Sequence, residues 1–142
     1  MPAGDSNAYD LGSTGEISPL STAQRAELSR LVQQARSICG FAFGVYIGPL
    51  TDGRDSAVAQ HAQMRDAASA VLVAVDPTSR SIEIVTGVNT VAALANRACE
   101  FAALSMKSCF VADDLVGGVR EGVNLLAHHA RHPQVQHLDE PA

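Results

Sequence analysis

A β-hairpin in the middle of the chain is the clearest prediction of the hydrophobic pattern. Residues 71–75 are five consecutive apolar residues, mostly β-branched, which is typical of a strand buried on both faces. Asp76 and Pro77 then predict a turn, because proline presets φ and the aspartate side chain can accept a bond from a backbone N–H further along. Residues 82–86 predict a second strand, with its isoleucines at alternate positions, and Gly87 ends it.

The pattern before the hairpin predicts an arm, a helix and a strand. Residues 1–19 have few apolar side chains and are expected to be a flexible arm. Ser21 and Gln24 have the spacing of a capping box, so a helix is predicted to begin there, and Gly40 suits its left-handed end. Residues 41–47 alternate large apolar side chains with small ones and predict the first strand of the sheet.

Three further helices are predicted. A helix over residues 56–65 fits the connection between the first strand and the hairpin, and it makes these two strands parallel neighbours. An Ala-rich helix is expected from about residue 89 to residue 106, largely buried because its small side chains allow close packing. The last helix should start after Asp113 and Asp114, where the helix dipole favours acidic groups, and Pro133 should end it.

These elements predict one domain over residues 20–132, followed by a flexible acidic tail over residues 133–142. Its fold class is α/β: a three-layer α/β/α sandwich with a parallel strand pair, an antiparallel hairpin strand and helices on both faces of the sheet. A chain of 142 residues with 46% hydrophobic content can form the core of one such domain. The outer strand at residues 82–86 has an open edge, so a monomer or a weak homodimer is expected.

Charge and composition exclude several classes of partner. The net charge is −5 and there is no basic run, which argues against nucleic acid and anionic membrane surfaces. The longest apolar stretches have the length of a strand, and the N-terminus lacks the pattern of a signal peptide. A cytoplasmic location without membrane insertion is therefore expected.

Several motifs resemble the TPM-domain family over residues 18–131. They are Phe43-Gly-Val-Tyr-Ile, Val71-Leu-Val-Ala-Val-Asp-Pro, Ile82-Glu-Ile-Val-Thr-Gly, and Asp113-Asp-Leu-Val-Gly-Gly-Val ahead of Gly122-Val-Asn-Leu-Leu. Arg80 resembles the basic residue of that family's hairpin turn, and the chain looks closest to a small actinobacterial branch of unknown function. The resemblance implies a Rossmann-like sandwich. Family members include a lumenal protein credited with phosphatase activity and membrane-anchored auxiliary proteins with no known catalysis.

Five aspartates are candidates for a cation site. If the first two strands are parallel, their carboxyl ends share one edge of the sheet, and the chain direction brings Asp76, Asp113 and Asp114 to that edge. Asp52 and Asp55 are weaker candidates for the same place. Open α/β sheets bind ligands at this edge, and converging carboxylates are what calcium or magnesium requires.

The alternative is that each aspartate has a local structural role. Asp52 and Asp55 would then form a loop and a helix cap, Asp76 a turn, and Asp113 or Asp114 the cap of the last helix. Both interpretations of the acidic residues stay open at this point.

Two functions are compatible with these residues. The first is a non-catalytic interaction or regulatory module for an unknown protein partner, with a divalent cation at the acidic edge. The second is a metal-assisted phosphatase for phosphomonoesters, in which Asp76, Asp113 and Asp114 hold the cation while Arg54 or Arg80 offsets phosphate charge.

Three glycines are expected to be structural. Gly87 ends the outer strand of the hairpin. Gly117 and Gly118 disfavour a helix interior, so they indicate a close approach to the last helix, for which packing of the helix on the sheet is the commoner cause.

Overall fold

The computed structural model describes residues 20–139 and the side chains of residues 20–131. The arm expected at residues 1–19 and the end of the tail at residues 140–142 lie outside the described residues. The elements follow in the order α1 (Thr22–Cys39), β2 (Ala42–Ile47), α2 (Arg54–Ala62), the 3₁₀ turn η3 (Ala67–Ser69), β3 (Ala70–Asp76), β4 (Ser81–Thr86), α3 (Asn96–Val111) and α4 (Leu115–Asp139).

The sheet has three strands in the order β2-β3-β4. β3 lies in the centre and pairs parallel with β2, where Phe43 faces Val71, and antiparallel with β4, where Val73 faces Ile84. The predicted parallel pair and antiparallel hairpin strand are therefore confirmed. So is the mixed α/β class of the fold.

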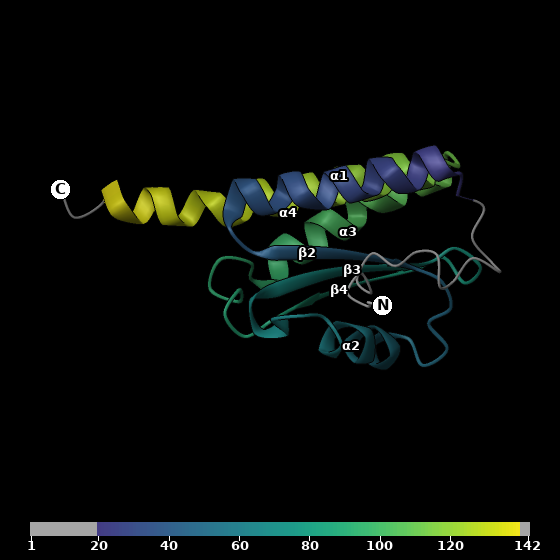
Figure 1. The fold of residues 1–142 in the computed structure, drawn as a ribbon, viewed down its shortest axis with the longest axis horizontal. Helices are drawn as coiled ribbons and strands as arrows, with labels where there is room; N and C mark the ends of the chain where they lie inside the picture. Colours follow the sequence, from purple (N-terminus) through teal and green to yellow (C-terminus); the bar gives the residue numbers. More distant parts are fainter. Residues whose placement is uncertain (1–19, 140–142) are drawn as a thin grey trace.

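Helices lie on both sides of this sheet (Figure 1). α1, α3 and α4 lie on one side, where alternate β3 residues such as Val73 join the larger hydrophobic core. α2 lies on the other side, where Leu72 packs with Ala57 and Met64 in a smaller core. Every residue of β3 is buried, as its uninterrupted apolar run predicts.

The ends of α1 form as the sequence predicts. Ser21 Oγ accepts a hydrogen bond from Gln24 N at 3.1 Å, and Ser21 N donates to Gln24 Oε1 at 2.9 Å. These two bonds are the capping box, which satisfies amides that the first helical turn leaves without partners. Gly40 ends the helix with φ of 88°, a left-handed conformation that glycine adopts without steric strain.

α2 and α3 differ from the predicted ranges. α2 begins at Arg54 rather than at residue 56, because Gly53 with φ of 58° turns the chain directly into the helix. α3 begins at Asn96 rather than near residue 89. In the intervening turn, Thr90 Oγ1 donates to Gly87 O at 2.8 Å and Asn89 N donates to Ala68 O at 2.8 Å. These bonds hold the chain beside the end of β4 before the helix can start.

The expectation that α3 is largely buried is wrong. Its fully buried residues are Ala102 and Met106, whereas Phe101 is 60% exposed and Leu104 is 64% exposed. The helix is apolar on two faces, and tertiary packing covers one of them.

The expectation that Pro133 ends the last helix is also wrong, since α4 continues to Asp139. Among the described residues no helix has the length and apolar character needed to cross a membrane.

The glycines of α4 allow close packing between helices rather than packing on the sheet. A Cβ atom at Gly118 would overlap the Phe110 ring, and one at Gly122 would overlap the Met106 side chain. Phe110 and Met106 both belong to α3. Small residues at these two positions therefore let α3 and α4 approach each other.

Candidate functional site

The Asp76 carboxylate is bound by backbone amides at the carboxyl end of β3. Oδ1 accepts hydrogen bonds from Thr78 N at 3.0 Å and Ser79 N at 3.3 Å, which confirms the predicted turn. Oδ2 accepts a buried hydrogen bond from Leu50 N at 3.0 Å. Leu50 lies in the loop between β2 and α2, so Asp76 ties two loops together at this edge of the sheet.

These bonds keep Asp76 ionised. Burial on its own would raise the pKa of this carboxyl, but the amides of Leu50, Ser79 and Thr78 outweigh burial and hold the pKa below its usual range. Both oxygens are engaged. A role for Asp76 as a cation ligand or as an acid would have to compete with these backbone hydrogen bonds.

Asp113 and Asp114 have separate local roles in the link between α3 and α4. Asp113 has φ of 67°, and its N–H donates to Phe110 O at 2.9 Å while Asp114 N donates to Cys109 O at 2.9 Å. This pair of bonds is a Schellman motif that closes α3. Asp114 Oδ1 accepts from Gly117 N at 2.9 Å and so caps α4. A Cβ at Gly117 would overlap that carboxylate, which explains the glycine.

The residues at the start of α2 point to a different neighbour. Arg54 Nη1 donates to Glu83 Oε1 at 3.0 Å and to Ile84 O at 3.2 Å, so this arginine covers part of the outer edge of β4. The edge of the outer strand β4, which the sequence predicts to be open, is therefore partly covered by the Arg54 side chain. Asp52 lies in the loop before α2 and Asp55 in its first turn, and both are exposed.

The structure does not gather the predicted aspartates into a cation site. Among the side chains of residues 20–131, no three His, Cys, Asp or Glu residues lie close enough together to hold a metal ion. The bonds of Asp76 and Asp114 match the alternative prediction, in which each aspartate serves a local turn or cap.

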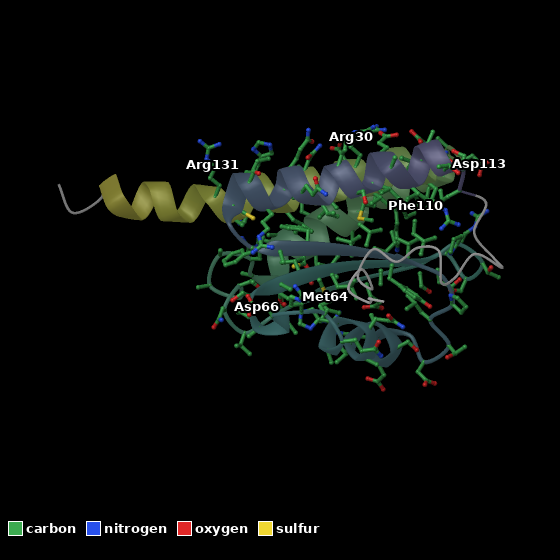
Figure 2. The ribbon with its side chains drawn as sticks, in the orientation of Figure 1. Arg30, Met64, Asp66, Phe110, Asp113 and Arg131 are labelled. Carbon is green, nitrogen blue, oxygen red and sulfur yellow. The ribbon has the colours of Figure 1, made fainter. Side chains whose placement is uncertain are left out.

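A pocket of about 500 Å³ lies at the carboxyl end of β3. Its walls are the β3–β4 turn, the end of α3 and the start of α4. The lining residues are the apolar Val75, Pro77, Phe110, Val111 and Leu115 and the charged Asp76, Arg80, Lys107 and Asp113. Figure 2 shows Phe110 and Asp113 on the side of the sheet that carries α1, α3 and α4, and Met64 and Asp66 on its other side. The pocket lining includes Asp76 and Asp113, which the chain direction places at this edge, but not Asp114, and it adds Arg80 from the turn.

Arg80 and Lys107 are the positive groups of this pocket, and both are exposed. The ion pairs formed by the side chains of residues 20–131 are Arg54–Glu83 and Arg120–Glu27. Within that part of the chain, neither Arg80 nor Lys107 is paired with a carboxylate. Arg80 has φ of 60° at the end of the turn, a conformation that is uncommon for residues other than glycine.

The sequence reasoning missed the contribution of α3 to the pocket. Phe101, Leu104 and Val111 are 60%, 64% and 80% exposed. Their helical spacing places them on one face, opposite the buried Ala102 and Met106. Val111 also lines the pocket, so this apolar face leads into it. The spacing of these side chains was a usable signal, but it could not show which face of α3 is covered.

Comparisons with known proteins give a family and a fold. The family described as "Domain of unknown function (DUF5130)" matches residues 5–127. No curated protein matches the chain. A similar solved structure is the solution NMR structure of the N-terminal domain of a protein from P. gingivalis, with a TM-score of 0.62 and 19% identity. The match covers 78% of this chain and 75% of that one. At this identity, the likeness concerns the fold alone.

Proposed function

The chain belongs to the DUF5130 family, and from this premise we propose that it is a binding module that performs no catalytic step and holds its ligand in the pocket at the carboxyl end of β3. We also propose that the fold is a Rossmann-like α/β/α sandwich of TPM type and that the protein is cytoplasmic. Helices on both sides of the sheet support the sandwich.

The pocket is the observation that carries this proposal. Open α/β sheets bind ligands outside the carboxyl ends of their strands, and this pocket lies at the carboxyl end of the central strand. Its volume of about 500 Å³ falls within the range of small-molecule sites, which are mostly apolar with a few polar groups. The lining has this composition.

The carboxylates favour binding over catalysis. Asp76 accepts three backbone hydrogen bonds, and Asp114 caps α4. A metal-assisted phosphatase would need these carboxylates for its cation and either Arg54 or Arg80 to offset phosphate charge. Arg80 lines the pocket, but Arg54 is bound to Glu83 on the outer strand. We therefore favour the binding module and treat the phosphatase as the competing outcome.

A neutral fluorescent dye, N-phenyl-1-naphthylamine, tests the pocket directly. We expect a saturable rise in fluorescence with the wild type, and weaker binding by about threefold to tenfold in Val111→Gln, because part of the apolar wall is replaced. Val88→Gln is the matched control, since Val88 is 77% exposed against 80% for Val111 but does not line the pocket.

Two results would overturn the binding module. One is a dye that does not bind, or that binds equally well to both variants. The other is turnover of a panel of phosphomonoesters, assayed with and without magnesium and calcium, that rises with protein concentration and is lost in Arg80→Gln. The second result would establish the phosphatase instead.

A further inference from the structure

We infer that the pocket selects a small amphiphilic anion, a molecule with an apolar body and one carboxylate or phosphate group. The inference rests on the proposed function, because it names the ligand class of the same pocket. Three features carry it: the apolar walls, two positive side chains that different elements contribute to the lining, and two carboxylates that compete little with a bound anion.

The apolar walls come from three separate elements. Val75 is fully buried at the end of β3, and Phe110 and Leu115 are partly buried where α3 ends and α4 begins. Val111 and Pro77 extend this surface outward. Apolar area removed from water contributes about 25 cal/mol per Å², so a chain of several methylene groups would bind here without any specific polar contact. Affinity from this part of the site does not depend on the charge of the ligand.

The positive groups come from two elements of the pocket wall. Arg80 comes from the β3–β4 turn and Lys107 from α3. Lys107 is four residues before Val111 and therefore lies on the same helix face as that apolar residue. An apolar body against Val111 would thus place its charged end near Lys107. Arginine and lysine both bind carboxylates and phosphates through charge-assisted hydrogen bonds.

The negative groups of the lining are Asp76 and Asp113. Asp76 is 7% exposed and directs both oxygens at backbone amides, which offset its charge locally. Asp113 is exposed and sits in the link after α3, so water and salt screen it. Arg80 and Lys107 therefore remain the charges available to a ligand, while Asp113 weakens their attraction without cancelling it.

A series of ten-carbon ligands separates the effect of charge from that of the apolar body. Decanoate, decyl phosphate, decanol and decylammonium, each kept below its micelle concentration, compete with the neutral dye for the full-length protein. We expect both anions to bind at least about fivefold more tightly than decanol, and decylammonium to bind least tightly. Raising the salt concentration should shrink the advantage of the anions and leave decanol unchanged.

Matched variants locate the positive charge that the anion meets. Lys107→Gln and Arg80→Gln should each remove most of the advantage of decanoate over decanol, while Lys107→Arg should keep it. Arg97→Gln is the control, because Arg97 is an exposed cation on the same helix that does not line the pocket. Asp113→Asn should strengthen the binding of both anions.

The outcomes distinguish this inference from the proposed function on which it rests. If decanol displaces the dye as well as decanoate does, the pocket binds ligands but the anionic class is wrong. If decylammonium binds most tightly, Asp113 rather than Lys107 and Arg80 selects the ligand, which also overturns the inference. If the neutral dye fails to bind, the proposed function fails together with it.

Discussion

Replacing Asp76 by asparagine keeps the shape of the side chain and removes its charge. In the native protein, the two carboxylate oxygens accept hydrogen bonds from three backbone amides, those of Leu50, Thr78 and Ser79. Asparagine has one acceptor oxygen and one NH₂ group. If its oxygen faces the turn, the buried Leu50 N–H meets a donor; if its oxygen faces Leu50, the two turn amides lose their acceptor.

The expected loss of stability follows from these bonds. A hydrogen bond to a charged group contributes about 1.5–3 kcal/mol, and the variant loses at least one such bond while weakening the others. We expect Asp76→Asn to lower the free energy of unfolding by about 3 kcal/mol at neutral pH. For a domain of this size, this corresponds to a fall in Tm of roughly 10 °C.

The loss should depend on pH in a defined direction. The amides hold the folded pKa of Asp76 below its usual range, even though burial opposes them. The stabilisation is therefore complete above the unfolded pKa of about 3.9 and is lost as the pH falls through the folded pKa. Asparagine does not titrate, so the gap in stability between wild type and variant should close in acid.

Urea unfolding followed by circular dichroism, at steps from about pH 7 to about pH 3, measures this gap. Asp52→Asn is the control. Asp52 is exposed, and its bonds to Ser56 and Asp55 use its backbone N–H and C=O groups, which the substitution keeps. The control should change the free energy of unfolding by less than about 0.5 kcal/mol. A variant Asp76→Asn as stable as the wild type at neutral pH, or a gap that stays constant into acid, would refute the reasoning.

Three further predictions concern stability and metal ions. Gly87→Ala should lower the free energy of unfolding in urea by several kcal/mol, because its Cβ would overlap the Ala67 and Ala68 carbonyls. In Gly40→Ala the Cβ would meet open space, so only the left-handed backbone costs stability, about 1–2 kcal/mol. Asp113→Gly should raise stability by about 1 kcal/mol, since glycine relieves the positive φ; an unchanged midpoint would count against the motif that closes α3. Millimolar calcium or magnesium should leave the thermal unfolding curve in place if the aspartates are caps, and a rise in Tm that grows with ion concentration would restore the cation site.

The sequence predicts the parts of this fold whose causes are local. The apolar run of β3, the capping box at Ser21 and Gln24, and the turn at Asp76 each depend on a few neighbouring residues, and each is confirmed. The start of α3 depends instead on a bond from Asn89 to Ala68, which belongs to the preceding connection. Such long-range contacts are not visible in local spacing.

The candidate site follows the same division. Chain direction alone places Asp76 and Asp113 near one pocket. It could not reveal that Leu50, 26 residues away, binds the Asp76 carboxylate, and that bond favours a structural role over a metal site. The position of Lys107 in the pocket lining was equally hidden, because it depends on where α3 ends relative to the β3–β4 turn.

Backbone amide NMR spectra of the wild-type protein, recorded during a titration with decanoate, test the central claim most directly. The account predicts saturable shifts that concentrate at the pocket, at Arg80, Lys107 and Asp113. Met64 and Asp66, on the other side of the sheet, should stay unchanged (Figure 2). Decylammonium at the same concentrations should cause much smaller shifts. Saturable shifts that centre elsewhere, or no shifts with any of the ten-carbon ligands, would contradict a binding site at the carboxyl end of β3.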